Sequence, residues 1–224
     1  EHAYFEAPSM RRIGNLYYLV YSSQSQHELC YAVSTFPDRD FVYGGVIISN
    51  GDVGYRGNTK PVNYIGTNHG GLVNICGQWY IFYHRNTHGI ATSRQGCAEK
   101  IYIDKETGQI AQVPITSYGL YGKPFDAAGE FPAYMACYLE KYDTQPKMKV
   151  GNDLKTTEPY YYEEKPNGGP YEHYIANITN RTVWGYNAFS LKNSQLIKLT
   201  LRGRAHGEIT VSTDRNGNTP VTRF

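Results

Sequence analysis

The strongest constraint on the fold of this chain is an internal repeat with an offset of 62 residues. Residues 17–22 read Tyr-Tyr-Leu-Val-Tyr-Ser, and residues 79–84 read Trp-Tyr-Ile-Phe-Tyr-His. The same offset places residues 6–9, Glu-Ala-Pro-Ser, opposite residues 68–71, Asn-His-Gly-Gly. A repeat of this length that is built from short strands is typical of propeller blades, which are four-stranded antiparallel sheets packed around a channel.

Both copies follow one pattern: a short polar segment, a strand, a turn at Gly14 or Gly77, and an aromatic strand. Equivalent innermost strands of a propeller face the same channel. We therefore expect Glu6, Asn68 and His69 to line one cavity, although they lie far apart in the sequence.

The composition favours an all-β protein. The 22 tyrosines occur with β-branched residues in runs that are interrupted by 23 glycines and 11 prolines, and such runs favour strands. Tyrosine rings also stack on sugars, but most of these tyrosines are expected to be ordinary strand residues.

The net charge and the cysteine spacing argue against binding to nucleic acid or an anionic membrane and against a cysteine metal site. The 22 basic and 20 acidic residues give a net charge of +2, which offers no electrostatic attraction for nucleic acid or an anionic membrane. No apolar run approaches the ~20 residues of a membrane span. The four cysteines have no metal-type spacing, and we expect them to be mostly free and buried.

The pattern divides the chain into three parts. Residues 1–113 are predicted to form two propeller blades, residues 114–135 a linker, and residues 136–224 a small β-sandwich. An exposed loop is expected at residues 160–169. The expected strands are residues 16–22, 28–34, 41–49, 70–75, 78–85, 89–93, 97–104, 110–113, 173–178, 188–191, 196–202 and 208–213.

Glu6 is the candidate catalytic residue. It lies between Phe5 and the Ala7-Pro8 pair, and a carboxyl group beside apolar surface has a raised pKa, as a general acid requires near neutral pH. The alternative is a surface glutamate at the end of a strand.

Three motifs in order resemble the C-terminal part of the catalytic domain of glycoside hydrolase family 43, a five-bladed β-propeller. They are residues 4–9 followed by 14–22, residues 68–71 followed by 77–85, and residues 93–95 before 98–101. The resemblance covers residues 1–113 and implies that they are the last two blades of five.

The resemblance also implies roles for individual residues. Glu6 matches the general acid of the family, and His69 matches a histidine at the floor of the channel that in some members belongs to the water shell of a calcium ion. Arg94 matches an arginine that reaches the substrate, and Phe5 and Asn68 are expected to contact it too. No cofactor is required, although a structural calcium is compatible with the family. The alternatives are a structural histidine at position 69 and a surface salt bridge at Arg94.

Family 43 enzymes invert the anomeric centre and use an acid and a base whose carboxyl groups lie roughly 6.5–9.5 Å apart. In the family, the base and a third carboxylate that tunes the acid are aspartates of earlier blades. Asp38, Asp40 and Asp52 do not occupy the repeat position of Glu6. Two blades alone would also leave sheet edges open, so we expect the active enzyme to contain a further N-terminal propeller segment, on a separate chain or in the same gene product.

The C-terminal region resembles carbohydrate-binding modules of family 6, which are β-sandwiches. The resemblance rests on residues 174–178, 182–187, 198–203 and 207–211. Trp184 and Tyr186 could form a sugar-stacking platform, although packing in the protein interior is the expected role.

These features predict an inverting glycosidase of the arabinofuranosidase or β-xylosidase type that acts on arabinose- or xylose-containing polysaccharide. The alternative is a non-catalytic carbohydrate-binding or scaffold protein that retains part of the propeller. A sialidase-type propeller is disfavoured, because the arginine cluster that binds a carboxylated sugar is absent from the sequence. A bacterial periplasmic or secreted location is favoured over a cytoplasmic one but is not fixed by the sequence.

Overall fold

The structure is a computed structural model that describes residues 2–141, 158–192, 196–204 and 206–224. Its regular elements are strands, apart from three 3₁₀ turns, η1 (Tyr55–Gly57), η2 (Gly119–Tyr121) and η3 (Ala133–Met135). The prediction of an all-β protein is confirmed. Among the described residues, no helix is long and apolar enough to cross a membrane.

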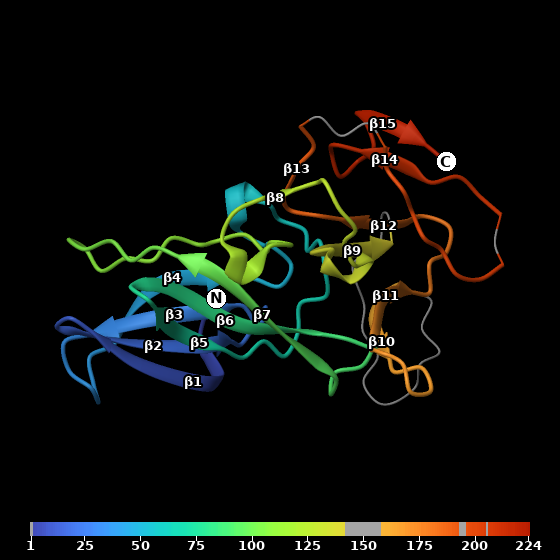
Figure 1. Cartoon of the computed structure of the whole chain (residues 1–224). Coiled ribbons are helices and arrows are strands. Elements are labelled where there is room, and N and C mark those ends of the chain that lie inside the picture. The colour runs from blue at the N-terminus through green and yellow to red at the C-terminus, as the bar shows by residue number, and fades with distance from the viewer. Residues whose placement is uncertain (1, 142–157, 193–195, 205) are drawn as a thin grey trace.

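Two antiparallel sheets form the N-terminal part (Figure 1). The first has the order β1-β2-β3-β4, and the second has the order β5-β6-β7. A bridge between Ile103 and Ile110 follows β7. Residues 89–93, which were predicted to form a strand, form no strand; they are mostly turn, with a single bridge position at Ile90. The strands are β1 (Tyr4–Ile13), β2 (Leu16–Ser23), β3 (Leu29–Ser34), β4 (Val42–Ile48), β5 (Gly71–Ile75), β6 (Gln78–Asn86) and β7 (Arg94–Ile101).

The two sheets share one hydrophobic core. Tyr18 and Leu29 from the first sheet pack in the same cluster as Leu72, Ile81 and Ile101 from the second. Each of these five side chains is at most 1% exposed, and burying one contributes roughly 1.5–3 kcal/mol. The shared core fixes the position of the first hairpin of each copy relative to the other.

Two glycines allow the sheets to touch at the start of β5. A Cβ atom on Gly70 would lie 1.9 Å from the carbonyl oxygen of Phe82, and one on Gly71 would lie 2.5 Å from Ser9 Oγ. The contact of Gly70 with a backbone atom excludes a side chain there, and a side chain at position 71 would require Ser9 to move. Gly71 therefore allows the close approach of β5 to β1, while Gly70 makes room for Phe82 of β6 in its own sheet and for Leu29 of β3.

The C-terminal elements form two-stranded ladders within the described residues. Pairing is antiparallel for β9 with β12, β10 with β11 and β14 with β15, and parallel for β8 with β13. The β-sandwich and the domain boundaries stay predictions. The strands are β8 (Phe125–Asp126), β9 (Tyr138–Lys141), β10 (Tyr160–Glu164), β11 (Glu172–Ala176), β12 (Thr182–Gly185), β13 (Phe189–Ser190), β14 (Thr210–Ser212) and β15 (Pro220–Arg223).

Two predictions for the C-terminal region are wrong. The expected exposed loop at residues 160–169 contains β10, and Tyr161 in β10 is only 3% exposed. Residues 196–202, which were expected to form a strand, have no regular structure. Trp184 packs against the cluster of Leu139, Tyr161 and Ile175, which agrees with a packing role for this ring.

Arg85 joins the two parts of the chain. Its Nη1 and Nη2 donate to the carbonyl oxygens of Ala136 and Tyr134, and its Nε donates to Gln95 Oε1 at 3.0 Å. The guanidinium carbon lies 3.7 Å from the centre of the Tyr161 ring, a cation–π contact. The end of β6 is therefore held by η3 and β10.

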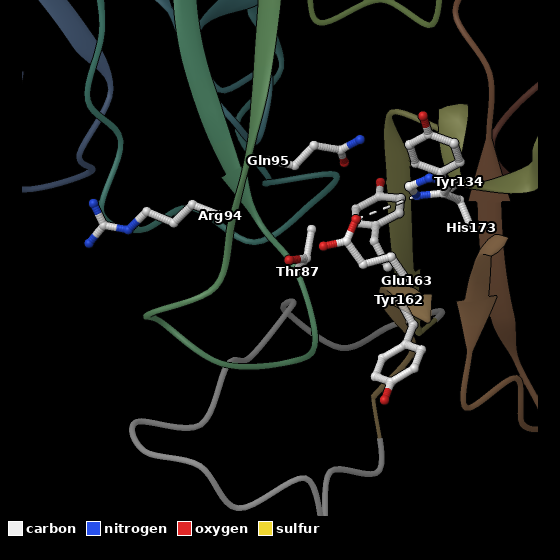
Figure 2. A pocket seen from close by; sticks show the side chains of 8 residues that line it. Thr87, Arg94, Gln95, Tyr134, Tyr162, Glu163 and His173 are labelled. Atoms are coloured by element: carbon white, nitrogen blue, oxygen red, sulfur yellow. Dashed lines mark ion pairs between the residues drawn. The ribbon is translucent and has the colours of Figure 1, made fainter. Parts of the chain in front are cut away.

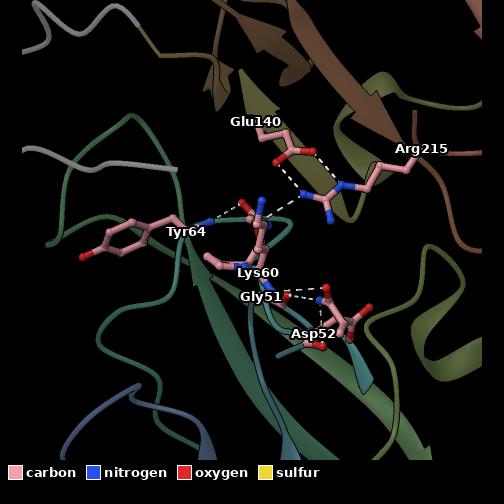
Figure 3. Close-up of polar contacts among 9 residues, drawn as sticks. Gly51, Asp52, Lys60, Tyr64, Glu140 and Arg215 are labelled. Carbon is pink, nitrogen blue, oxygen red and sulfur yellow. Dashed lines mark hydrogen bonds and ion pairs between the residues drawn. The ribbon is translucent and has the colours of Figure 1, made fainter. Parts of the chain in front are cut away.

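Within the C-terminal part, Arg215 forms an ion pair with Glu140 close to the junction (Figure 3). It is bidentate, with Nε to Oε1 at 2.7 Å and Nη2 to Oε2 at 2.6 Å. Only 7% of the Glu140 side chain is exposed. The loop between β14 and β15 is thus fixed to β9, and Leu139 of β9 donates its N–H to Val62 O at 3.0 Å.

The cysteines are all free. Cys30 and Cys137 are buried, and Cys97 is partly buried. Cys76 is exposed because it lies in the turn between β5 and β6. The prediction of mostly free and buried cysteines therefore holds except at Cys76.

Two buried carboxyl groups hold the segment that follows the second sheet. Asp52 accepts the N–H of Ile115 at 2.9 Å, and Glu99 accepts the N–H of Thr116 at 2.7 Å. Tyr83 also donates its hydroxyl to Glu99 at 3.1 Å. Burial raises the pKa of Asp52 to about 6 and that of Glu99 to about 8, although these hydrogen bonds act in the opposite direction.

The raised pKa of Glu99 predicts a loss of stability with increasing pH. The unfolded chain loses this proton near pH 4.5, whereas the folded chain keeps it until about pH 8. Unfolding therefore becomes easier as pH rises through this window, by up to about 5 kcal/mol in total from this group.

Urea unfolding between pH 5 and 8.5 tests this expectation. Glu99→Gln should flatten the pH dependence, because glutamine has no proton to lose. Glu106→Gln, a control at an exposed position, should leave the slope unchanged. An unchanged slope in Glu99→Gln would contradict the raised pKa.

Candidate active site

Glu6 lies at an irregularity of β1. It pairs with Ser22 of β2, and the register shifts on both sides of it, between Tyr4 and Glu6 and between Glu6 and Ser9. Ala7 has a φ of 61°, a left-handed conformation that costs a residue with a Cβ roughly 1–2 kcal/mol. A bulge of this kind redirects side chains at the edge of a sheet, and here it accompanies the turn of Glu6 toward the second sheet.

His69 is the partner of Glu6. The distance from His69 Nε2 to Glu6 Oε1 is 2.9 Å, and the two side chains are 37% and 39% exposed. His69 lies two residues before β5 begins, where Gly70 and Gly71 bring the second sheet against the first. The expectation that Glu6 and His69 face one cavity is consistent with this contact.

A second histidine, His84, packs against the ring of His69 and accepts a hydrogen bond from its backbone. The two ring centres are 5.5 Å apart in an edge-to-face arrangement, and His84 Nδ1 accepts the backbone N–H of His69 at 3.4 Å. Burial, followed by the positive charge of Arg94, lowers the pKa of His84 to about 4. His84 is therefore neutral at pH 7, and its Nδ1 is available as an acceptor.

Asn68 does not offer its side chain to solvent. It is 0% exposed, and its Oδ1 accepts the N–H of His84 at 3.4 Å. Complete burial argues against the predicted sugar contact, because a ligand cannot reach the amide. In this structure Asn68 holds β6 in place beneath the site.

Arg94 and Phe5 lie at the exposed margin of the site. Arg94 opens β7, and its Nε donates to Ala91 O at 3.3 Å. No carboxylate of the described residues pairs with Arg94, so its charge is available to a ligand. Phe5 is 47% exposed and packs edge-to-face on His27 with ring centres 5.1 Å apart.

The prediction that apolar neighbours raise the pKa of Glu6 is wrong for the chain described. The hydrogen bond from His69 lowers this pKa, and the positive charges of His69, His27 and Arg94 act in the same direction. Desolvation acts in the opposite direction but is smaller than the His69 hydrogen bond, because the carboxyl group remains 39% exposed.

The residues of this site do not by themselves form a calcium site. Calcium takes six to eight oxygen ligands, whereas Glu6 is the one carboxylate that contacts His69 among the described residues. A calcium ion whose water shell includes His69 therefore stays a prediction that requires further oxygen donors.

One other cluster has metal-type donors. His2 Nδ1, a Glu28 carboxylate oxygen and Cys30 Sγ lie within 4.8 Å of one another. Glu28 already accepts the hydroxyl of Ser23 and lies 3.0 Å from His2 Nδ1. Burial and the neighbouring Glu28 raise the pKa of the Cys30 thiol to about 12. The contacts of Glu28 with Ser23 and His2 connect this cluster to the strands around it.

His84 and Arg85 were missed in the sequence. The offset of 62 aligns them with Ser22 and Ser23, which are both completely buried. Two basic side chains at the end of an otherwise aromatic strand could have indicated a polar site, because buried basic groups need partners.

Removing His69 should raise the pKa of Glu6 toward 4.5, the ordinary value. The reason is that the His69 hydrogen bond is the largest cause of the lowered pKa. Titration of the Glu6 carboxyl carbon by NMR in His69→Ala measures the shift. His27→Ala should give a smaller rise, since His27 acts only through its charge. Equal shifts in both variants would contradict the geometry.

No protein-family model matches the chain. It is 43% identical over 220 residues to a xylosidase/arabinosidase of Thermoclostridium stercorarium, a match that covers 96% of this chain and 46% of that protein. A β-xylosidase of Xylanibacter ruminicola is 38% identical over 84 residues, which cover 37% of this chain and 22% of that protein. The chain thus spans less than half the length of these curated relatives.

Among solved structures, a GH43_1 enzyme from Xanthomonas citri is similar with a TM-score of 0.42 and 28% identity, over 55% of this chain and 33% of that one. An α-L-arabinofuranosidase from Clostridium thermocellum has a TM-score of 0.39 and 30% identity, over 50% of this chain and 37% of that one. Over almost its whole length, therefore, the chain is homologous to about half of a protein named as a xylosidase/arabinosidase.

Proposed function

We propose that this chain is part of a family 43 glycoside hydrolase of the β-xylosidase or arabinofuranosidase type. The observation that carries the proposal is the Glu6–His69 pair, with 2.9 Å between its atoms, in a chain that is 43% identical to a xylosidase/arabinosidase. Glu6 protonates the glycosidic oxygen of the leaving sugar. Arg94 and Phe5 contact the substrate at the exposed margin.

The base is an aspartate outside this sequence. A water between the base and the sugar attacks the anomeric carbon, while Glu6 gives its proton to the departing oxygen, so that the configuration inverts. The further N-terminal propeller segment supplies that base. This fits a chain that corresponds to 46% of its relative's length.

Glu6 must hold a proton before it can act as an acid. In the chain described, the hydrogen bond from His69 lowers the pKa of Glu6. A neighbouring carboxylate raises the pKa of an acid by repelling its ionised form. We propose that a second aspartate of the N-terminal segment has this effect, and that His69 then orients the carboxyl group of Glu6.

The substrate class rests on the names of the relatives. Solved structures of similar chains contain xylose or xylotriose, and we extend this to a xylose- or arabinose-containing oligosaccharide for the present chain. No organic cofactor takes part in the proposed reaction.

Activity on aryl xyloside and aryl arabinofuranoside tests the proposal, together with the intact mass of the native protein. We expect turnover by the native protein, with a mass larger than that of this chain. A folded native protein that binds arabinoxylan but hydrolyses neither substrate would replace the proposal with a carbohydrate-binding function.

A further inference from the structure

Histidine and glutamate side chains form three close pairs among the described residues, which are His2–Glu28, His69–Glu6 and His173–Glu163. The glutamates of the second and third pairs are 39% and 50% exposed, and Figure 2 shows the third pair in the wall of a cavity. The side chain of Glu28, in contrast, is 6% exposed. A carboxylate so far from water needs charged or polar partners within the protein.

The nitrogen next to Glu28 is close to the carboxylate but is not hydrogen-bonded to it. Ser23 donates its hydroxyl to Glu28 Oε2. His2 Nδ1 lies 3.0 Å from Glu28 Oε1, yet among the described residues this buried nitrogen has no hydrogen-bond partner. The distance suits a hydrogen bond, whereas the direction does not. Ligand atoms of one tetrahedral zinc ion lie about 3.3–3.6 Å from one another, so the two atoms are placed like ligands of one cation.

The third donor of this group is the thiol of Cys30, which is 0% exposed. Cys30 Sγ, His2 Nδ1 and a carboxylate oxygen of Glu28 lie within 4.8 Å of one another. Glu28 and Cys30 are two positions apart at the start of β3, and residues with this spacing in an extended chain share one face of a sheet. Leu29 between them belongs to the core that the two sheets share, whereas Cys30 belongs to a separate cluster. The group therefore lies on the face of the first sheet that is turned away from the shared core.

Contacts outside the donor atoms hold His2 in place. Tyr21 donates its hydroxyl to His2 O at 2.8 Å, and the N–H of Gln24 donates to Ala3 O at 2.9 Å. The ring of His2 stacks on Tyr43 of β4, with centres 5.3 Å apart and an interplanar angle of 3°. The segment before β1 is thus fixed against the turn after β2 and against β4. Supporting contacts of this kind orient the ligands of metal ions.

The chemistry of the three donors selects the kind of cation. Thiolate and imidazole are ligands of Zn²⁺ and related transition metals, whereas Ca²⁺ and Mg²⁺ prefer oxygen. A neutral imidazole, a carboxylate and a thiolate together carry two negative charges, which a divalent cation balances in a buried place. On binding, the metal takes the place of the thiol proton of Cys30, which is released to solvent. A protonated His2 would neutralise Glu28 without a metal, but it would give Cys30 no part in the group.

We propose that His2, Glu28 and Cys30 bind one Zn²⁺ ion, with water as the fourth ligand. The ion joins the segment before β1 to β3. Its ligands come from two distant segments and include one cysteine, which is why the spacing of the cysteines gave no sign of a metal site. This ion differs from the calcium considered for His69, because calcium takes oxygen ligands. The inference does not depend on the proposed function.

Cobalt(II) is the probe for this site, because it replaces Zn²⁺ and is visible by absorption. A thiolate bound to Co²⁺ gives a charge-transfer absorption in the near ultraviolet, and tetrahedral Co²⁺ absorbs strongly in the visible. The whole native protein, after treatment with a chelator, should show both absorptions when Co²⁺ is added. An equal amount of Zn²⁺ should remove them, and an excess of Ca²⁺ should not. Absence of the thiolate absorption, or its loss in Ca²⁺, would overturn the proposal.

Two cysteine variants identify the sulfur ligand. Cys30→Ser should abolish the charge-transfer absorption, whereas Cys76→Ser, which changes an exposed cysteine, should leave it unchanged. An absorption that persists in Cys30→Ser would show that another thiol binds the metal and would overturn the proposal.

Two histidine variants test the site without disturbing a buried residue. The side chains of His2 and His173 are 34% and 31% exposed, and each is paired with a glutamate. His2→Ala should weaken Co²⁺ binding at least about 100-fold, because even the loss of an outer contact of a metal ligand costs about 10–100-fold. His173→Ala should leave the affinity unchanged. Equal affinities in the two variants would overturn the proposal and leave His2–Glu28 as an ion pair without a metal.

Discussion

Glu6→Gln in the whole native protein should lower kcat about 10²–10⁴-fold on xylo- or arabino-oligosaccharides. A sugar alkoxide is a poor leaving group and needs a proton from the acid as the glycosidic bond breaks. A 2,4-dinitrophenyl glycoside leaves without that proton, so its turnover should fall less than about 10-fold. Steady-state kinetics on the two substrates measures the difference.

The control for this experiment is Glu130→Gln, which changes an exposed glutamate and should leave both rates unaltered. A similar loss on both substrates in Glu6→Gln would remove Glu6 from the acid role, because a general acid discriminates between leaving groups. Denaturation of each variant must be compared with that of the native protein, so that a folding defect is recognised.

Arg85→Met should lower the free energy of unfolding by about 3–5 kcal/mol. The substitution leaves the carbonyl oxygens of Ala136 and Tyr134 without the donors that they have in this structure. It also removes the cation–π contact with Tyr161. Urea denaturation, followed by tryptophan fluorescence, measures the loss.

Arg39→Met provides a matched control. Arg39 also lies over an aromatic ring, 4.0 Å from the centre of Phe36, but its side chain is 56% exposed and pairs with exposed Asp38. Surface contacts of this kind contribute about 0–1 kcal/mol, so this variant should be nearly neutral. If both variants lose the same stability, Arg85 does not hold the two parts of the chain together.

The fold of the N-terminal part followed from local patterns in the sequence. The aromatic runs predicted β2 and β6, and the turns at Gly14 and Gly77 predicted the hairpins around them. These features depend on neighbouring residues, because alternation and turn chemistry act within a few positions. The first hairpin of each copy accordingly has the predicted pairing of strands.

The C-terminal part was harder to predict because its stability depends on distant partners. Residues 160–164 read as three tyrosines and two glutamates beside Lys-Pro-Asn-Gly-Gly, a pattern typical of an exposed loop. Tyr161 is buried in a cluster with Leu139 and Ile175, and Arg85, 76 positions earlier, lies over its ring. No local pattern contains that information.

In the candidate site, too, local patterns identified residues, whereas contacts between distant residues set their properties. The motif around Glu6 identified this residue as the candidate acid, whereas its immediate neighbours Phe5 and Ala7 gave the wrong direction for its pKa. That direction is set by His69, 63 positions away in the sequence. The sequence therefore identified residues of the candidate site. The environment of their side chains depends on the contact between the two sheets, which no local pattern describes.

That contact between sheets has a mechanical consequence. Gly71 leaves no side chain as a spacer between β5 and β1, and the Glu6–His69 hydrogen bond of 2.9 Å joins the two sheets. Sliding a strand by one residue moves its atoms about 3.3 Å, beyond the reach of a hydrogen bond. The bond therefore forms in a single alignment of the two sheets, so that any other register would separate Glu6 from His69.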